Sequence, residues 1–184
     1  DCPKGASYPS GAVDFKLSEA KFYSADNLKV NVALGKKATL DTNGGKVSYI
    51  CGNEKRLTDG YKFNDLGDTE LLAATYDTAS PKSFSMTLDL GSVYNISSVE
   101  LYGIDKNMTA SKDNLAWTKY DISDISVVGS LDGKVYNIPV GTLKNYADID
   151  EAAGTDKSYS RIDLSSPESV RYLKFARSGI SGYT

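Results

Sequence analysis

The sequence predicts an all-β domain, an antiparallel β-sandwich of the jelly-roll kind, and three observations lead to that expectation. Short runs with alternating apolar and polar residues recur along the chain, turn-forming Gly, Asp, Ser and Pro separate them, and helical periodicity is scarce. An alternating strand buries only one face, so many such strands need two packed layers. With 184 residues and 40% hydrophobic content, the chain can build one sizeable core in one domain.

The expected strands follow one another through the second half of the chain. They cover residues 84–90, 99–102, 121–128, 135–140, 159–164 and 170–175. Between two of them, the segment Ser130-Leu131-Asp132-Gly133-Lys134 predicts a hairpin connection in which Gly133 takes a positive φ without steric cost. The core is expected to include Leu88, Leu90, Val99, Leu101, Ile125, Val127, Tyr172 and Leu173.

The chain is expected to divide into two parts. Residues 1–30 form an N-terminal extension packed on the domain, and residues 31–184 form the β-sandwich itself. Within the extension, residues 18–23 suit an added strand or a helix. Residues 13–23 and 145–153 are the two places where the pattern is compatible with a short helix.

Composition argues against several classes of function. The chain has Lys+Arg 21 against Asp+Glu 24, and a net charge of -3 gives no broad electrostatic footprint for nucleic acid or an anionic membrane. It contains no run of roughly 18 to 20 apolar residues and no cleavable signal at its start, so an exported protein would be present here in its mature form. The absence of histidine excludes a Ser-His-Asp triad or a Cys-His dyad, so we do not expect an enzyme.

The two cysteines, Cys2 and Cys51, allow a single disulfide bond. Because the chain has no Cys-x-x-Cys motif and no His to complete a zinc site, we favour the disulfide over two unpaired thiols. Closing a loop of this span would stabilise the fold by about 4 kcal/mol in the chain-entropy model. The bond would also tie the N-terminal extension to the sandwich.

Five short segments fall in one order between residues 31 and 175. They are Asn31-Val32-Ala33-Leu34-Gly35-Lys36-Lys37-Ala38-Thr39, Leu57-Thr58-Asp59-Gly60, Leu88-Asp89-Leu90-Gly91, Gly129-Ser130-Leu131-Asp132-Gly133 and Arg171-Tyr172-Leu173-Lys174-Phe175. In order and spacing they resemble the discoidin family, or coagulation factor 5/8 type C domains, which includes carbohydrate-binding module family 32. The resemblance covers roughly residues 30–177 and implies a galactose-binding-like sandwich. Family members usually continue beyond residues 178–184 into one more strand, so this chain apparently lacks the family's last strand.

The resemblance implies a structural calcium ion at the second segment. The matching carboxylate is that of Asp59, supplemented by main-chain carbonyls such as those of Arg56 and Tyr61, since calcium takes six to eight oxygen ligands. The alternative is an Asp-Gly turn without a metal ion.

The sugar-binding relatives imply an aromatic platform, with a ring that stacks on a pyranose beside polar groups that bind its hydroxyls. No histidine matches that of the galactose-preferring members, so galactose specificity is not expected. Each aromatic candidate has the alternative of core packing or ordinary exposure. The candidate ligand-binding residues are Tyr61, Phe63, Asp105, Lys106, Asn107, Trp117 and Tyr183.

The expected function is therefore a non-catalytic, extracellular or cell-surface glycan-binding module, lectin-like and stabilised by calcium, whose partner is a glycan or glycoprotein. It would accompany a larger glycoside-active enzyme or a surface assembly. The alternative is a structural or adhesive ectodomain that binds another protein. Phosphatidylserine binding is weaker, because we expect no loop tip with a pair of large exposed aliphatic residues beside a basic cluster.

Overall fold

The computed structural model describes residues 13–17, 19–41, 46–49, 56–60, 72–75, 82–102, 125–143 and 159–180. These residues form strands, turns and one short 3₁₀ helix, η1 (Arg56–Thr58). None of the described helical structure is long and apolar enough to cross a membrane. The strands are β1 (Val13–Leu17), β2 (Glu19–Ser24), β3 (Asn27–Asn31), β4 (Ala38–Asp41), β5 (Lys46–Tyr49), β6 (Leu72–Thr75), β7 (Lys82–Tyr102), β8 (Ile125–Ser130), β9 (Ile138–Leu143) and β10 (Tyr159–Ile180).

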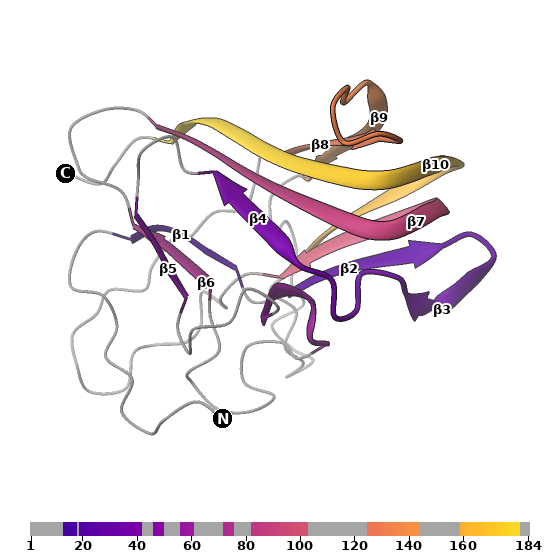
Figure 1. Cartoon of the computed structure of the whole chain (residues 1–184), viewed down its shortest axis with the longest axis horizontal. Helices are drawn as coiled ribbons and strands as arrows, with labels where there is room; N and C mark the ends of the chain where they lie inside the picture. The colour runs from indigo at the N-terminus through magenta and orange to yellow at the C-terminus, as the bar shows by residue number, and fades with distance from the viewer. Residues whose placement is uncertain are drawn as a thin grey trace, which may run out of the picture.

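The strands form two antiparallel sheets (Figure 1). The small sheet has the order β1-β6-β5. The large sheet has the order β3-β2-β7-β10-β8-β9, and β4 also pairs with β7. The central pair, β7 and β10, runs antiparallel through the whole large sheet.

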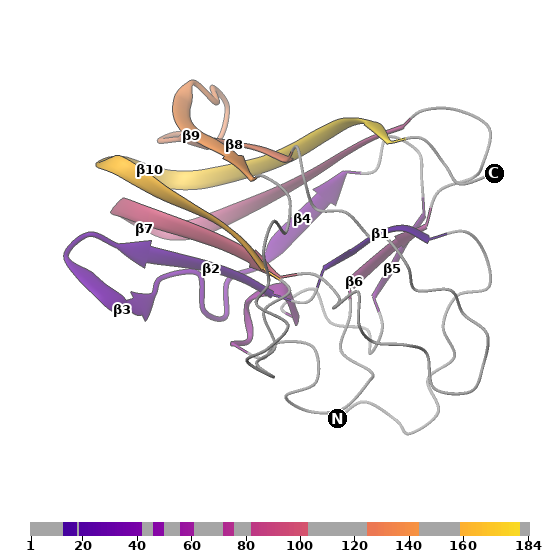
Figure 2. The same ribbon diagram turned by 180° about the vertical axis from the view of Figure 1, so that it is seen from behind.

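Both central strands bend, which divides the large sheet into two limbs (Figures 1 and 2). The β7–β10 register shifts between Asp163 and Glu168 and between Val170 and Tyr172, and Gly91 in β7 has φ 84°. We call limb A the part formed by β3, β2, the second half of β7 and the first half of β10. Limb B contains β4, the first half of β7, the second half of β10, β8 and β9.

The hydrophobic core lies between the two limbs. Phe22 of limb A meets Phe175 of limb B edge-on, with ring centroids 5.6 Å apart, and full burial of a side chain of this kind stabilises the fold by roughly 1.5–3 kcal/mol. Two limbs that pack face to face make the predicted antiparallel sandwich, which is confirmed. Seven of the predicted core residues are buried: Leu88, Leu90, Val99, Leu101, Ile125, Val127 and Leu173.

The eighth predicted core residue, Tyr172, is only half-buried, so that prediction is wrong. Successive side chains of a strand point to opposite faces. Leu173 and Phe175 of β10 are in the core, and Tyr172 and Lys174 therefore lie on the outer face of limb B.

Several predicted strands are longer or shifted in the structure. Residues 84–90 and 99–102 belong to one strand, β7, and residues 159–164 and 170–175 to another, β10. The hairpin between β8 and β9 is confirmed, with Gly133 at φ 72°. The strand expected over 135–140 begins only at Ile138, because the turn continues further: Asp132 Oδ1 accepts hydrogen bonds from the main-chain N–H of Lys134 (2.8 Å) and Val135 (2.9 Å).

Of the two alternatives for residues 18–23, the added strand is confirmed by β2, and the short helix that the pattern allowed over residues 13–23 is replaced by β1 and β2. Ala20 and Phe22 are buried while Lys21 and Tyr23 are half-buried, the two-residue period of a strand. β2 pairs with β7 along Glu19–Ser24 and is part of the large sheet. The other expected helix, residues 145–153, lies outside the described residues.

Candidate functional site

The five sequence segments that carry the family resemblance meet in space. The first runs from the end of β3 in limb A to β4 in limb B, the third, fourth and fifth lie on limb B, and the second contains η1.

The first and second segments are joined by main-chain and hydroxyl hydrogen bonds. Thr58 Oγ1 donates to the carbonyl of Lys36 (2.5 Å), and the Gly35 N–H donates to the carbonyl of Thr58 (2.5 Å). The next residues reach limb A, because the Gly60 N–H donates to Oε1 of the buried Glu19 (3.2 Å). The turn at residues 57–60 therefore connects the start of β4 in limb B with the start of β2 in limb A.

The third and fifth segments are joined by an ion pair. Arg171 donates from Nε to Asp89 Oδ1 (2.9 Å) and from Nη2 to Oδ2 (3.0 Å), a two-point contact that fixes both groups. The Gly91 N–H also donates to Asp89 Oδ1 (2.8 Å). The Arg171 guanidinium, followed by the Gly91 N–H and the Tyr172 hydroxyl, lowers the pKa of Asp89, so this carboxylate is ionised at neutral pH.

The fourth segment rests on Tyr172. The Arg171 guanidinium lies 4.9 Å from the centroid of the Tyr172 ring. A Cβ atom added at Gly133 would come within 3.1 Å of the same ring. Both contacts occupy the ring, so Tyr172 supports the hairpin tip rather than offering a free face for stacking.

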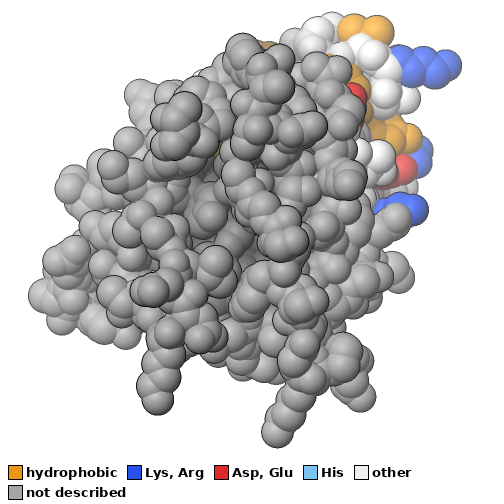
Figure 3. All heavy atoms as spheres, turned by 90° about the vertical axis from the view of Figure 1, so that its left-hand side faces the viewer, with side chains coloured by type: hydrophobic (Ala, Val, Ile, Leu, Met, Phe, Trp, Pro, Cys, Tyr) orange, Lys and Arg blue, Asp and Glu red, His pale blue; other side chains and the backbone are white. Residues whose placement is uncertain are grey.

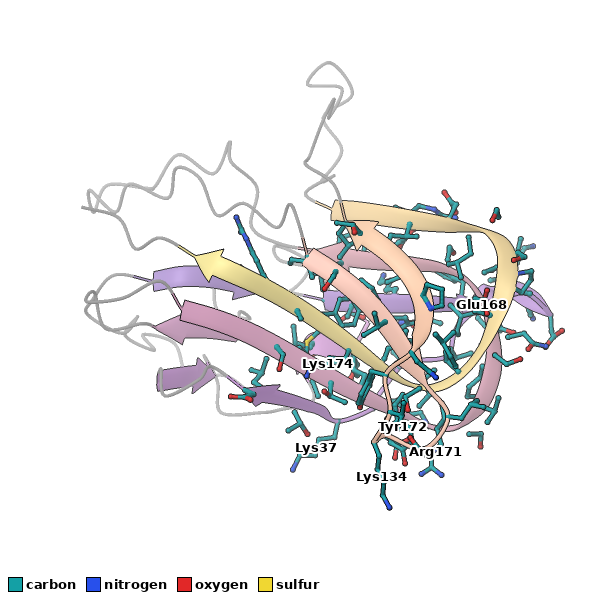
Figure 4. The ribbon with its side chains drawn as sticks, turned by 90° about the horizontal axis from the view of Figure 1, so that it is seen from above. Lys37, Lys134, Glu168, Arg171, Tyr172 and Lys174 are labelled. Atoms are coloured by element: carbon teal, nitrogen blue, oxygen red, sulfur yellow. The ribbon has the colours of Figure 1, made fainter. Side chains whose placement is uncertain are left out.

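A second tyrosine lies beside this junction. Lys174 Nζ is 5.8 Å from the centroid of the Tyr136 ring, a distance at which an ammonium group is attracted to the ring electrons. Burial raises the pKa of Tyr136, partly offset by a hydrogen bond from Thr87. We call the surface formed by Lys134, Tyr136, Arg171, Tyr172 and Lys174 the tyrosine–lysine face; Figure 4 shows its labelled members on one side of the molecule, with Glu168 apart from them.

The hairpin tip of this face also exposes apolar side chains. Leu131 and Val135 are 54% and 57% exposed, and Lys134 lies between them in the chain. At this hairpin tip the two exposed aliphatic residues therefore accompany one basic residue, Lys134, whereas the arrangement that we did not expect at a loop tip is an aliphatic pair beside a basic cluster. In the view of Figure 3, basic side chains project from the margin that the described residues form.

The outer face of limb A carries a different polar cluster, which we call the Glu100 network. The carboxylate of Glu100, whose side chain is only 8% exposed, accepts from Arg161 Nη1 (2.6 Å), from the Tyr102 hydroxyl (2.8 Å) and from the Tyr23 hydroxyl (3.3 Å). Arg161 also pairs with Asp163 (2.6 Å). Burial, then the charge of Glu100, raises the pKa of Tyr23 to about 12. The network's own members use the acceptor oxygens of Glu100, which leaves it poorly placed to act as a general base.

The structure places only part of the predicted site. Arg56 begins η1, and Asp59 is half-buried in the turn that follows. Among the described residues, no three His, Cys, Asp or Glu side chains group closely enough to hold a metal ion. The other predicted site residues lie outside the described residues: Tyr61, Phe63, Asp105, Lys106, Asn107, Trp117 and Tyr183, together with Cys2 and Cys51.

Sequence reasoning did not identify the tyrosine–lysine face. The available signal was the alternation Tyr172-Leu173-Lys174-Phe175, which puts an aromatic and a basic residue on the solvent side of a strand. The pairing of Tyr172 with Asp89 and Ser130 depends on strand register, which the sequence does not state.

No family model matches the sequence, and no curated protein matches it. Among solved structures, the chain is similar to the lectin domain of lectinolysin, complexed with Lewis B antigen, at 19% identity and a TM-score of 0.45, over 82% of this chain and 89% of that chain. It is also similar to CBM32-1 from a family 31 glycoside hydrolase of Clostridium perfringens, at 19% identity and a TM-score of 0.40, over 81% and 89% of the two chains. At this level of identity the likeness concerns the fold alone.

Proposed function

We propose that the chain is a non-catalytic glycan-binding module. The observation that carries the proposal is that the five segments with family-like order also form one connected set of contacts. Thr58 bonds to Lys36, Asp89 pairs with Arg171, and Gly133 packs on Tyr172. The pairing of Ala38 in β4 with Leu88 in β7 joins the first two segments to the other three. Segments spread over some 145 residues would not need to meet if each were only a common turn or strand end. This arrangement supports the discoidin-like reading of the sequence and the sugar-binding role that the reading implies.

The polar chemistry of the described residues supports a binding role over a catalytic one. The chain has no histidine, so a general base would have to be a carboxylate or a lysine with a shifted pKa. The buried carboxylate of Glu100 is occupied by three donors of its own network. Recognition of a ligand by hydrogen bonds and charge requires no such base.

We propose that the sugar platform lies on the loops that were predicted from the sequence. The turn at residues 57–60 is held from both limbs, and the chain leads from it directly to Tyr61 and Phe63. A firmly held anchor reduces the conformational entropy lost when a loop orders on a ligand. Trp117, Asp105, Lys106, Asn107 and Tyr183 complete the proposed platform.

Calcium is proposed as a structural ion at the same turn. The described residues supply the Asp59 carboxylate and main-chain carbonyls such as that of Arg56, which is the oxygen chemistry that calcium prefers. They do not complete its coordination, so Tyr61 and other residues outside the described part would supply the remaining oxygens. Bound calcium would hold the turn that connects the limbs. We also propose an extracellular or cell-surface location, attached to a larger enzyme or surface assembly.

The test is a glycan array with and without chelator, followed by titration of the best ligand. Trp117 is the only tryptophan, so a sugar bound at the platform should shift its fluorescence. Trp117→Ala should abolish binding while leaving the melting temperature within about 1–2 °C, as for a surface residue. Tyr94→Phe on limb A is a matched control that should bind normally.

An array with no ligand in either condition would refute the proposal. It would favour the adhesive alternative, for which the exposed Leu28 and Val30 on the edge strand β3 provide an apolar contact surface.

A further inference from the structure

We propose that the tyrosine–lysine face is a second ligand surface, which binds an acidic saccharide bearing sulfate or carboxylate groups. The proposal rests on the glycan-binding function above and concerns a different part of the molecule from the loop platform. Its basis is the placement of cations on the outer face of limb B.

Lys174 occupies a central position on this face. In register it lies between Thr87 of β7 and Val128 of β8. Its ammonium group rests over the Tyr136 ring, and no carboxylate of the residues that the structure describes forms an ion pair with it. A cation held over a ring can still receive an anion from the solvent side, because the ring occupies only one of its sides.

Lys134 is exposed at the tip of the hairpin, and the hairpin is fixed in place by Gly133 on Tyr172. The adjacent carboxylate of Asp132 is turned toward the backbone. The main-chain N–H groups of Val135 and Lys134, and then Ser130, hold the pKa of Asp132 low. These bonds direct its charge into the turn rather than toward the Lys134 ammonium group.

Two more lysines, Lys36 and Lys37, lie in the segment just before β4. Lys36 Nζ lies 3.3 Å from the position of an added Cβ at Gly91, next to the Asp89–Arg171 pair. Lys37 is exposed, and Figure 4 shows it on the same side as Lys134 and Arg171. Arg171 already neutralises Asp89. The excess charge of this surface is therefore positive, although the whole chain carries a net charge of -3.

The rings on this face do not suit a neutral sugar. Arg171 and Gly133 occupy the Tyr172 ring, and Lys174 covers one side of the Tyr136 ring. The ammonium groups instead suit a ligand that carries anionic groups. Each exposed contact is weak and screened by salt, so the ligand must offer several charges.

The experiment is calorimetric titration of the full chain with a heparin-derived hexasaccharide and with its fully desulfated, N-acetylated counterpart, at 50 mM and 300 mM NaCl. We expect the sulfated ligand to bind more tightly, and more weakly at the higher salt concentration. Lys134→Gln combined with Lys174→Gln should weaken its binding about tenfold, the value for two lost exposed charge contacts. Lys21→Gln combined with Lys29→Gln, which removes the same charge from limb A, should change it little.

Three controls keep the result interpretable. Lys134→Arg combined with Lys174→Arg should retain binding, and the melting temperature of every variant is measured. Trp117→Ala should leave the sulfated ligand bound, which separates this surface from the loop platform. Equal loss in both double glutamine variants, or binding of the desulfated ligand only, would overturn the proposal while leaving the proposed function intact. Equally tight binding to phosphatidylserine vesicles or to a single-stranded oligonucleotide of matched charge would overturn the saccharide assignment.

Discussion

The outer faces of the two limbs both combine carboxylates, basic residues and tyrosines, but the charges are partnered differently on the two faces. On limb A, the Glu100 network places a carboxylate at 8% exposure and surrounds it with Arg161 and two tyrosine hydroxyls. On limb B, Asp89 is 43% exposed, Lys134 is exposed and Lys174 is half-buried. A buried charge needs its partners to remain stable. The polar groups on the outer face of limb A therefore stabilise the fold by partnering one another, whereas limb B has positive charge that a ligand could contact.

The largest expected effect is the loss of the buried carboxylate. Glu100→Ala leaves Arg161 and two hydroxyls without their acceptor, and we expect a loss of about 3 kcal/mol in the free energy of unfolding, the low end for a broken buried pair because Arg161 is 40% exposed. Urea denaturation measures it. Asp163→Ala, which removes the 67% exposed partner of the same arginine, should cost under about 1 kcal/mol. Equal losses in the two variants would show that burial does not distinguish these contacts.

The next largest expected effect is the loss of stability when calcium is removed from the turn at residues 57–60, which connects the limbs. If calcium binds at Asp59, a hundredfold excess over Kd stabilises the native state by about 2.7 kcal/mol, and chelator should lower the melting temperature accordingly. Asp59→Asn should remove the response to chelator. A melting temperature that is the same with and without chelator would rule out the ion, leaving an Asp-Gly turn held by protein contacts such as its bonds to Lys36 and Glu19.

Two glycines with nearly the same φ, Gly133 and Gly35, test whether Tyr172 supports the hairpin of limb B. Gly133 has φ 72° and an added Cβ would meet the Tyr172 ring at 3.1 Å, while Gly35 has φ 70° and open space around it. Gly35→Ala should cost about 1 kcal/mol, the price of left-handed backbone strain for alanine. Gly133→Ala should cost more, since the ring must also move. Equal shifts in the two melting temperatures would mean that Tyr172 does not support the hairpin.

The smallest effect concerns alkaline pH. An unfolded tyrosine ionises near pH 10, whereas Tyr23 in the folded state has a pKa of about 12, so the folded state keeps this proton longer. The contribution of Tyr23 is therefore fully present below pH 10 and is lost as the pH rises toward 12. Allowing for its partial exposure, the loss is about 1 kcal/mol. Unfolding free energies of the wild type and Tyr23→Phe from pH 8 to 11.5 measure it; parallel curves would contradict the assignment.

Much of the fold was readable from the sequence because burial follows a two-residue period. Leu88 and Leu90, or Ile125 and Val127, could be assigned to the core from alternation alone. The same rule was broken when the neighbours Tyr172 and Leu173 were both placed in the core. The continuity of β7 was not readable, because Gly91 looks like a strand end but is the point where the strand bends.

The candidate site was less predictable, because its contacts join residues far apart in the chain. Asp89 and Arg171 are 82 positions apart, and only the register of β7 against β10 brings them together. Glu100 looked like an ordinary polar residue on an alternating strand. Its burial depends on side chains that β2 and β10 supply from either side.

The pairing of β7 with β10 also has a consequence for how the chain folds and varies. The two strands are far apart in sequence, so their pairing gives a high contact order, which is associated with folding in milliseconds to seconds. The entropy of closing such a loop grows only slowly with its length, by about 0.6 kcal/mol for each doubling. Residues inserted between Tyr102 and Ile125, where much of the proposed sugar platform lies, would therefore cost the paired strands little. The sandwich built on β7 and β10 can therefore accommodate recognition loops of different lengths without a change in its hydrophobic core.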